Sequence, residues 1–458
     1  MTSTTTINPT TGAELATYED HTDDELTGIV DAAHGAFDDW RKRPLKERAG
    51  IVAKIGELLT ERADDLAKMM TDEMGKLISA GQQEVQLCAG ICSWTADNAE
   101  SELADEERQL DGGRAIVSYQ PVGIILGIQP FNFPVYQAIR YSIPQLVVGN
   151  PVLLKHASSV WGSALLLEEI YHDAGVPEDI FRVIKSSNDQ TTGLISNPKV
   201  RGVTLTGSGN AGSIIAAEAG KHLKKTVMEL GSNDAYLILS DADIPTAVQT
   251  CVQARIYNNG ETCVAAKRFV VVDSVYDAFR DGFVEQMRGI EMGDPNDASS
   301  GIGPMAREDL RDELHEQVKK SVDAGATASL GGEVPDRDGW FYPATVLEDV
   351  VPGMPAYDDE LFGPVASIIR VDSDEEAMRV ANDSRFGLGG GIFSKNTDRA
   401  VELALHEFDT GMININGYNL AHPNLPFGGV KDSGYGREHG GFGIKEFVNV
   451  KSVMIAGS

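Results

Sequence analysis

The chain has few cysteines, no long hydrophobic run and no sign of a targeting segment. Its four cysteines in 458 residues are too few to hold a chain of this length together by disulfides. Apolar runs such as residues 123–128 and 270–272 are far shorter than the ~18–20 residues that cross a bilayer. The first residues lack the basic stretch and apolar segment of a secretory signal. We therefore expect a cytoplasmic protein with reduced thiols and no membrane partner.

Basic residues are scarce relative to acids. The sequence has 39 Lys and Arg against 69 Asp and Glu, which gives a formal charge of −30. Such a field repels phosphate backbones and anionic lipids, so nucleic acid and membrane surfaces are excluded as partners. A hydrophobic content of 42% argues for a folded chain with its acids on the surface. This coat is typical of a halophilic protein, since a high-salt cytoplasm screens the repulsion. An ordinary acidic protein is the alternative.

The sequence offers little that could bind a metal. Cys88 and Cys92 are spaced i, i+4 on a predicted helix, but no second cysteine or histidine pair accompanies them. We expect both thiols to pack in a core, and we expect no metal centre. Residues 23–110 are predicted to be helical, because residues 24–40 and 47–70 place apolar side chains at spacings of three and four.

Beyond residue 119, short apolar segments alternate with helical ones. The predicted strands are residues 122–128, 151–155, 203–206, 235–239, 268–272 and 366–371, with a helix over 163–174. Alternation of this kind is typical of a parallel, doubly wound α/β sheet. Because it resumes after residue 235, we expect a second α/β domain.

A glycine-rich loop lies between a predicted strand and a predicted helix. Residues 207–212 read Gly-Ser-Gly-Asn-Ala-Gly and match the pattern G-x-G-x-x-G. In a dinucleotide-binding fold the N–H groups of this loop would face a pyrophosphate. Glu229 then lies near the spacing expected for a ribose-binding acid. The alternative is a tight turn without a ligand, because a single glycine motif is a weak signal.

Four further motifs carry residues suited to one chemistry. Residues 258–263, Asn-Asn-Gly-Glu-Thr-Cys, place Cys263 just after a turn, and Pro-Phe-Asn-Phe-Pro holds Asn132 between two prolines. Glu229 and Glu360 are single carboxylates among apolar neighbours, one before Cys263 and one after it. With these motifs in this order, the sequence resembles the aldehyde dehydrogenase superfamily. The resemblance covers nearly the whole chain, including residues 426–431 and 434–438.

The resemblance implies catalytic roles for three residues. Cys263 would attack the aldehyde carbonyl, because a thiolate is a strong nucleophile. Asn132 and the backbone N–H of Cys263 would donate to the oxyanion. Glu229 would be the general base that activates water for thioester hydrolysis, instead of a ribose ligand. Glu438 matches a carboxylate proposed as a proton relay, with a plain surface acid as the alternative.

The resemblance also implies a nicotinamide dinucleotide as cofactor. Glu360 would hold the nicotinamide ribose with Phe362 nearby, and Lys155 would contact the adenosine ribose. Relatives that prefer NAD usually have an acid where this sequence has Ser158, so NADP is favoured over NAD. Further cofactor contacts are implied at Phe131, Gly207, Ser208, Gly212 and Leu230.

Within the superfamily, the sequence is most similar to succinate-semialdehyde dehydrogenases. The shared segments are residues 154–158, 265–269, 312–318 and 355–358. Arg140 stands where that group carries an arginine for the substrate carboxylate, so we expect its guanidinium at the mouth of the substrate tunnel. The alternative is a helix-surface arginine that pairs with local acids. Arg255 is a second candidate.

Several positions depart from the family pattern. Glu261 replaces a glutamine, Ser232 replaces a glycine, and Ala421 stands where a hydroxyl is expected, so that only His422 could help to bind a carboxylate. Other semialdehydes or a broader range of aldehydes therefore remain open. A CoA-acylating enzyme is disfavoured because such relatives commonly lack the carboxylate of Glu229, and a non-catalytic paralogue would have little reason to keep all four motifs.

The resemblance implies three structural parts. A Rossmann-type NAD(P)-binding domain would comprise residues 1–103 and 121–231, and an α/β catalytic domain residues 232–446. Residues 104–120 and 447–458 would form a small oligomerisation β-arm. Asp111-Gly112-Gly113 independently predicts a hairpin turn, and the alternating residues 447–455 predict an edge strand that invites a partner chain. We expect a homodimer or a homotetramer.

Overall fold

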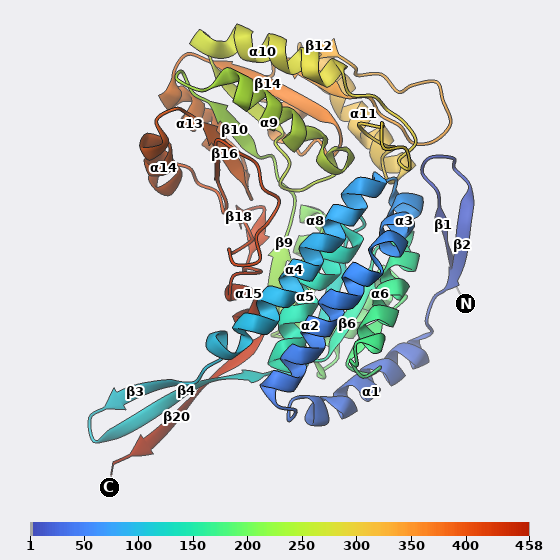
Figure 1. Cartoon of the computed structure of the whole chain (residues 1–458), viewed down its shortest axis with the longest axis vertical. Helices are drawn as coiled ribbons and strands as arrows, with labels where there is room; N and C mark the ends of the chain where they lie inside the picture. Colours follow the sequence, from blue (N-terminus) through green and yellow to red (C-terminus); the bar gives the residue numbers. More distant parts are fainter. Residues whose placement is uncertain (1–2, 458) are drawn as a thin grey trace.

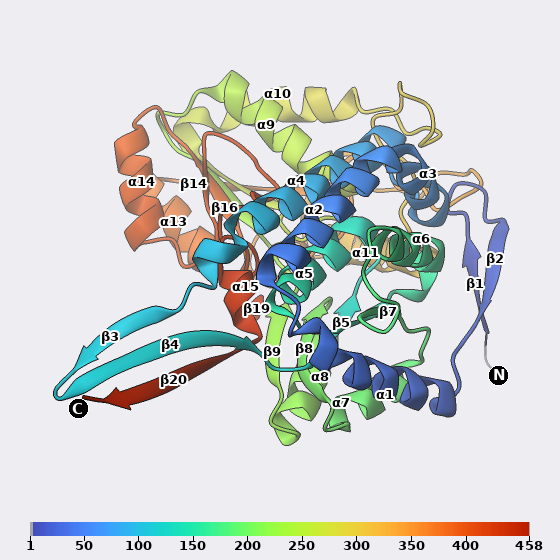
Figure 2. The same cartoon turned by 60° about the horizontal axis from the view of Figure 1, so that its bottom comes forward.

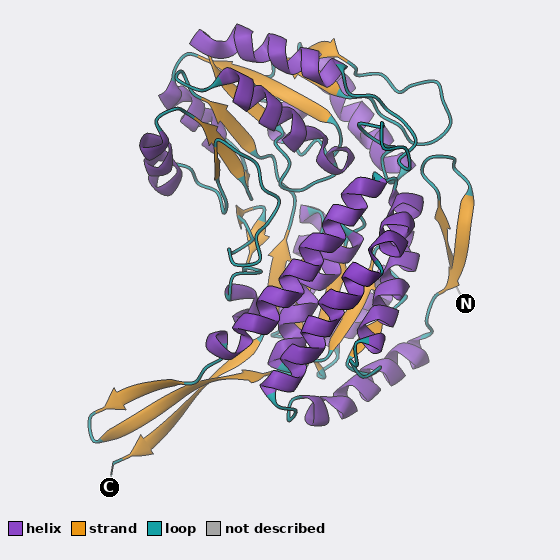
Figure 3. Cartoon of the chain, in the orientation of Figure 1, coloured by secondary structure: helices purple, strands orange, loops and turns teal. Residues whose placement is uncertain are grey.

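The structure is a computed structural model that describes residues 3–457. It contains two α/β regions, each with its own large sheet, and a separate β-arm (Figure 1). Helices flank both large sheets, whereas the arm consists of strands alone (Figure 3). The predicted α/β class with two sheets and an arm is confirmed. None of the helices in residues 3–457 is long and apolar enough to span a membrane.

The first sheet contains the strands that lead to the functional site. Its strands are β5 (Ile124–Gln129), β6 (Val152–His156), β7 (Phe181–Val183), β8 (Val200–Thr206), β9 (Lys225–Glu229) and β19 (Gly434–Tyr435). Their order is β19-β9-β8-β5-β6-β7, and every pair except β19–β9 is parallel. The strand order reverses between β5 and β8. In open α/β sheets, ligands bind in the crevice at the carboxyl ends of the strands at such a point.

Eight longer helices belong to this region, and two of the predicted boundaries were wrong. The helices are α1 (Asp23–Trp40), α2 (Leu45–Glu61), α3 (Ala63–Met74), α4 (Ile78–Glu102), α5 (Pro134–Val148), α6 (Trp161–Asp173), α7 (Asn188–Ser196) and α8 (Gly209–Lys221). The helical pattern over residues 47–70 is divided at Arg62, where the backbone leaves helical geometry. The helical prediction also fails at residues 106–110, which form β3 (Glu106–Leu110) because β4 (Gly113–Pro121) pairs with them.

A carboxylate in a buried ion pair connects α4 to the start of α5. Lys76 and Glu84 form this pair, and both side chains are completely buried. The second carboxylate oxygen of Glu84 accepts hydrogen bonds from the N–H groups of Val135 and Tyr136, at 2.9 and 2.8 Å. Glu84 therefore satisfies two N–H groups that a helix leaves free in its first turn. Removing one partner of such a pair leaves an uncompensated buried charge.

The second sheet is formed by residues that follow β9. Its strands are β10 (Ala235–Ile238), β11 (Arg268–Val272), β12 (Thr327–Leu330), β13 (Thr345–Glu348), β14 (Val365–Val371), β16 (Gly390–Phe393) and β17 (Asn414–Ile415). The order is β12-β13-β14-β11-β10-β16-β17, with only the β12–β13 pair antiparallel. The helices of this region are α9 (Ile244–Ile256), α10 (Asp273–Arg288), α11 (Glu308–Asp323), α12 (Pro355–Asp358), α13 (Asp374–Asn382) and α14 (Thr397–His406).

Smaller elements complete the chain and connect its parts. They are β1 (Ser3–Ile7), β2 (Glu14–Glu19), β15 (Phe386–Gly387), β18 (Val430–Lys431), α15 (Phe442–Glu446) and the short 3₁₀ helices η1 (Ser158–Val160) and η2 (Tyr257–Gly260). After β18 the chain returns to the first sheet, where β19 pairs with β9 through Gly434 and Glu229. The carbonyl of Gly443 in α15 then accepts a hydrogen bond from Gln145 of α5 at 3.1 Å. This return brings residues 434–446 against the first region.

The β-arm extends away from both α/β regions (Figure 2). Its strands have the order β20-β4-β3, and β20 (Val448–Ala456) pairs with β4 along its full length. Residues 111–112 form the turn between β3 and β4, where the sequence predicted a hairpin. Apolar side chains of β20 are exposed, among them Val450 at 59% and Met454 at 77%. One edge of β20 pairs with no other described strand.

Candidate active site

A cavity of about 1220 Å³ opens where the strand order of the first sheet reverses. Residues that follow β5 and β8 line it, including Asn132 and Gly207. Cys263, Glu360 and Phe362 line it from the second region. The crevice expected from the sheet topology is therefore the place where residues from several of the sequence motifs meet.

Cys263 follows a tight left-handed turn at the end of α9. Asn258, Asn259 and Gly260 have φ angles of 54°, 58° and 78°. Asparagine and glycine are the residues that adopt this conformation at the lowest cost. A Cβ atom at Gly260 would lie 2.3 Å from a backbone carbonyl carbon of the facing loop, so only glycine fits there. The side-chain amide of Asn258 donates to the carbonyl of Asn132 at 2.8 Å, which ties this turn to the first region.

The amide of Asn132 and the thiol of Cys263 face the same cavity. Asn132 Nδ2 donates one hydrogen bond to the carbonyl of Glu261 at 3.0 Å. An amide nitrogen carries two protons, so the second is available to an oxygen bound at the thiol. Burial raises the pKa of the Cys263 thiol to about 12, while the positive charges of Arg140 and Lys267 act in the opposite direction. The arrangement suits nucleophilic attack on a carbonyl whose oxygen the amide stabilises.

Glu229 ends β9 and is not part of the cavity lining, but its charge acts on the Cys263 thiol. Its neighbours Met228 and Leu230 line the cavity, as strand alternation requires. The Glu229 side chain is 2% exposed, and neither carboxylate oxygen accepts a hydrogen bond within residues 3–457. Burial raises its pKa well above the ordinary value, although the charge of Arg140 opposes this. A Cβ atom at Gly428 would lie 2.7 Å from Oε1, so backbone of the 426–431 motif packs on this carboxylate.

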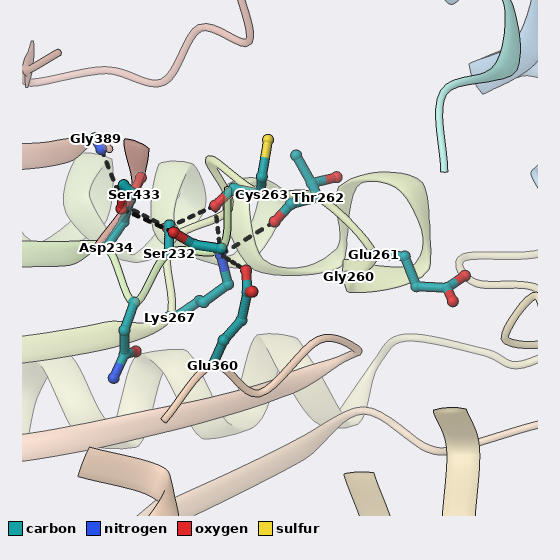
Figure 4. A network of polar contacts seen from close by, with 12 residues as sticks. Ser232, Asp234, Gly260, Glu261, Thr262, Cys263, Lys267, Glu360, Gly389 and Ser433 are labelled. Atoms are coloured by element: carbon teal, nitrogen blue, oxygen red, sulfur yellow. Dashed lines mark hydrogen bonds and ion pairs between the residues drawn. The ribbon is translucent and has the colours of Figure 1, made fainter. Parts of the chain in front are cut away.

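Glu360 belongs to a buried polar network behind the cavity (Figure 4). Its Oε1 pairs with Nζ of Lys267 at 3.2 Å. Ser232 donates to Oδ1 of Asp234 at 2.6 Å, and the N–H of Gly389 donates to the same oxygen at 3.0 Å. Burial raises the pKa of Glu360, and the charge of Lys267 lowers it. Phe362 and Phe131 meet edge to face near this carboxylate with their ring centres 6.3 Å apart.

Comparison with known proteins identifies the family. Residues 1–453 match the aldehyde dehydrogenase family. The chain belongs to this family. It is 42% identical over 448 residues to a protein of Deinococcus radiodurans named succinate-semialdehyde dehydrogenase [NADP(+)], covering 98% of this chain and 94% of that protein. A protein of Mycolicibacterium paratuberculosis with the same name is 42% identical over 457 residues, with 99% and 97% covered.

A solved aldehyde dehydrogenase structure has nearly the same fold. The succinic semialdehyde dehydrogenase from Streptococcus pyogenes, crystallised with NADP⁺, superposes with a TM-score of 0.97. It is 40% identical in sequence, and the match covers 99% of both chains. The likeness extends over both α/β regions and the arm, so the Rossmann-type architecture predicted from the sequence is confirmed.

The glycine loop of this aldehyde dehydrogenase lines the cavity beside Cys263. Gly207, Ser208 and Gly212 are all part of the lining. Ser208 caps α8 by accepting a hydrogen bond from the N–H of Ala211 at 3.3 Å. A Cβ atom at Gly212 would lie 2.5 Å from the side chain of Leu230, so the third glycine permits close packing of α8 on the following strand. The loop therefore presents a helix N-terminus to the cavity, a favourable site for an anionic group.

Lys155 and Ser158 lie near the carboxyl end of β6, at the same edge of the sheet as this loop, but neither of them lines the cavity. Lys155 is in β6, partly buried, and Ser158 begins η1 with its side chain exposed. Lys155 forms no ion pair with any residue in 3–457, and burial lowers its pKa. A cation without an ion-pair partner and an exposed hydroxyl three residues later suit recognition of a phosphate.

Arg140 does not occupy the position that the sequence suggested. Its side chain is only 1% exposed, and it forms an ion pair with Glu438. Its Nη2 donates to Thr206 at 2.8 Å, and the guanidinium lies 4.6 Å from the ring centre of Phe427. The expected free guanidinium at a tunnel mouth was wrong, because the return of the chain after β18 supplies Glu438 as a partner. The alternative of a surface acid at Glu438 was wrong for the same reason.

The other two candidates for substrate binding lie in different surroundings. Arg255 is completely buried, and its Nη2 donates to the carbonyl of Gly260 at 2.7 Å, so it supports the turn before Cys263. His422 is exposed. Its neighbours Leu420 and Ala421 pack against an apolar cluster that includes Cys263 and Phe427. The loop around His422 therefore approaches the nucleophile, whereas Arg255 lies behind it.

Two buried charges near Cys263 had no role in the sequence analysis. Both oxygens of Glu261, which replaces the usual glutamine, lie 3.1–3.2 Å from the N–H of Ala306, and burial raises its pKa to about 8. Lys267 is 2% exposed and contacts the backbone of the nucleophile loop. The available signal was two adjacent basic residues, Lys267 and Arg268, at the entry to a buried strand, where basic residues need partners.

Proposed function

We propose that this aldehyde dehydrogenase oxidises succinate semialdehyde to succinate with NADP. The observation that supports the chemistry best is one shared cavity, lined by Cys263 and Asn132 and by the glycine loop at Gly207. The substrate comes from the two bacterial relatives named above, which are 42% identical to this chain over at least 98% of its length. Because this sequence identity extends over both α/β regions, the simplest inference is that this chain catalyses the reaction named for those relatives.

The proposed reaction assigns one step to each of three side chains. The Cys263 thiolate attacks the aldehyde carbonyl, and the amide of Asn132 donates to the resulting oxyanion. NADP, when bound, would supply the hydride acceptor that oxidation of this adduct to a thioester requires. Glu229 then removes a proton from the water that hydrolyses the thioester. For this step the carboxyl of Glu229 must first lose its own proton. Because burial raises its pKa, this loss occurs at higher pH than for an exposed carboxyl. Glu438 pairs with Arg140, and its negative charge also raises the pKa of Glu229 directly.

The proposed preference for NADP rests on Lys155 and Ser158. Lys155 would attract the 2′-phosphate, and Ser158 adds a hydroxyl donor without the negative charge that would repel it. Gly207, Ser208 and Gly212 would receive the pyrophosphate, with Leu230 and Phe131 along the cavity wall. Glu360 and Phe362 would hold the nicotinamide ribose. The residues present fit this cofactor, since Lys155 has no carboxylate partner within residues 3–457.

Steady-state kinetics test the proposed substrate and cofactor together. The assay compares succinate semialdehyde with a neutral aldehyde of similar length, with NADP and NAD, at low and molar salt. We expect kcat/KM to be at least about tenfold higher for NADP than for NAD, because one charge-assisted phosphate contact is worth ~1.5–3 kcal/mol. A Lys155→Met variant should lose this preference and retain its rate with NAD. A tenfold preference for NAD would contradict the cofactor assignment.

The carboxylate of the substrate is tested with the same assay on variants. We propose that His422 attracts it from the loop beside Cys263. His422→Ala should lower kcat/KM for the semialdehyde more than for the neutral aldehyde. Equal losses on both aldehydes would leave the aldehyde dehydrogenase chemistry intact and refute the carboxylate role. Arg255→Gln is the comparison variant, since Arg255 supports the turn before Cys263.

The β-arm supports a proposal about assembly. We propose that residues 104–120 and 447–458 join copies of this chain into a dimer or tetramer, while residues 1–103 with 121–231 bind NADP and residues 232–446 carry the thiol. The free edge of β20 and its exposed side chains at Val450 and Met454 are the supporting observations. Light scattering should give at least twice the monomer mass, and Val450→Lys with Met454→Lys should reduce it. A monomeric wild type would refute the proposal.

The compartment and the salt requirement are proposed from composition. All four cysteines are free, which suits a reducing cytoplasm. The charge of −30 suits a high-salt cytoplasm, and the kinetic assay above tests this, since a halophilic enzyme should be more active in molar salt than in dilute buffer.

A further inference from the structure

Lys267 occupies the centre of the buried network behind the cavity (Figure 4). It lies just before β11 and is 2% exposed. Its ammonium contacts the carbonyl oxygens of Thr262 and Cys263, the first at 3.1 Å, and Oε1 of Glu360 at 3.2 Å. The hydroxyl of Ser232 lies 3.3 Å from the same nitrogen. One cation therefore touches both the nucleophile loop and the carboxylate that faces the cavity.

The geometry separates Lys267 from the reacting groups themselves. Cys263 and Glu360 line the cavity, but Lys267 does not. In Figure 4 the Cys263 thiol points away from the ammonium, while its backbone carbonyl points toward it. An ammonium group has three protons, so four oxygen neighbours fully engage it. Lys267 therefore does not touch a substrate in the cavity, and it acts on the reaction through the atoms that it holds and through its charge.

We propose that Lys267 is a positioning residue. Its single positive charge holds both the nucleophile loop and the carboxylate of Glu360 in place. This inference rests on the proposed roles of Cys263 and Glu360. By holding the carbonyls of Thr262 and Cys263, the ammonium fixes the loop from which the thiol projects into the cavity. By pairing with one oxygen of Glu360, it opposes the effect of burial on the pKa of that carboxylate and leaves the other oxygen to accept ribose hydroxyls.

The electrostatic consequence supports this role. Four charged groups act on the thiol: Arg140 and Lys267 lower the pKa of Cys263, and Glu360 and Glu229 raise it. Losing the ammonium would remove one of the two cations and leave both carboxylates in place. The thiol would then ionise at higher pH, and Glu360 would lose the charge that opposes the effect of its burial.

Lys267→Met tests the proposal, since methionine has a similar length and no charge. Two readouts need no aldehyde: the pH dependence of Cys263 alkylation by iodoacetamide, and the dissociation constant of NADPH by fluorescence. We expect the apparent pKa of the thiol to rise by about one unit. We expect the NADPH dissociation constant to rise about tenfold. A variant that binds NADPH and reacts with iodoacetamide as the wild type does would overturn the proposal.

The matched control is Lys76→Met, which also removes a buried lysine from an ion pair. Lys76 pairs with Glu84 and does not contact the nucleophile loop residues that Lys267 holds. Lys76→Met should destabilise the fold but leave the alkylation profile and NADPH binding at wild-type values. If both lysine variants shift the two readouts equally, the effect reflects loss of stability, and the proposal is refuted.

A double-mutant cycle isolates the path through Glu360. In a Glu360→Gln background, adding Lys267→Met should change the NADPH dissociation constant by less than about twofold, because the two residues act as one unit. Fully additive effects would overturn the proposed coupling. Since neither readout depends on the aldehyde, the result does not depend on whether succinate semialdehyde is the substrate. If Cys263→Ala left alkylation unchanged, the assignment of the nucleophile would fail instead.

Discussion

Cys263→Ala is expected to lower aldehyde oxidation by about 10⁴-fold or more, because no other residue can form the covalent adduct. Cys263 is the one cysteine that lines the cavity, whereas the other three are buried. The loss is measured as the rate of NADPH formation, which is followed by its absorbance. The variant should still bind NADPH, since the thiol contributes no contact to the phosphates or ribose in the proposed arrangement.

Cys251→Ala is the control for this experiment. Cys251 lies on α9, the helix that leads to the nucleophile loop, and burial raises the pKa of its thiol well above the ordinary value. A buried thiol of this kind packs as a small apolar group and does not react. Its loss should leave kcat near the wild-type value. Substantial turnover in Cys263→Ala would contradict the covalent mechanism and with it the proposed function.

Glu229→Gln is expected to separate the two halves of the reaction. Attack by Cys263 and hydride transfer should still give a burst of about one NADPH per subunit, because neither step needs the base after the thiolate has formed. Hydrolysis of the thioester should then slow by about 10²–10⁴-fold, the usual contribution of a general base. Rapid mixing with NADP and aldehyde measures both phases. NADPH affinity should not change, whereas a ribose-binding role for Glu229 would require it to fall.

The pH dependence gives this prediction a second test. Burial raises the pKa of Glu229 well above its ordinary value, and a general base works only when it is deprotonated. Steady-state turnover of the wild type should therefore increase with pH as the carboxyl loses its proton. The residual hydrolysis of Glu229→Gln should lose that dependence. A burst that disappears together with hydrolysis would show that Glu229 acts before the thioester forms.

Glu73→Gln is the control for removal of a buried carboxylate. Glu73 accepts hydrogen bonds from the N–H groups of Gly162 and Ser163 at the start of α6, and burial raises its pKa to about 7. It is outside the cavity lining. Glu73→Gln should lower stability, because an amide satisfies these donors less well. It should preserve both the burst and the hydrolysis step.

Most of the fold follows from local patterns in the sequence. The strands β5, β6, β8, β10, β11 and β14 were predicted to within about three residues, because short apolar runs between turn residues form buried parallel strands. The hairpin turn at residues 111–112 followed from its glycines. For residues 106–110 the apolar spacing predicted a helix, whereas the family resemblance implied part of a β-arm; they form β3, since pairing with β4 outweighs the weak local preference of a charged segment.

The sequence by itself determined the family and the principal reacting groups. Cys263, Asn132, Glu229 and Glu360 stand in motifs whose order is specific enough to identify the family without coordinates. A thiol, an amide and a carboxylate carry their chemistry in the residue type, so a motif alone can name them.

Only the tertiary structure decided which buried charges meet. Arg140 pairs with Glu438, which lies 298 positions further along the chain, because the segment after β18 returns to the first sheet. Lys267 reaches Glu360 from the start of a neighbouring strand for a comparable reason. The physical cause is that a buried charge pairs with whichever opposite charge the packing of distant segments brings within about 4 Å. The spacing of residues along the chain does not contain that information.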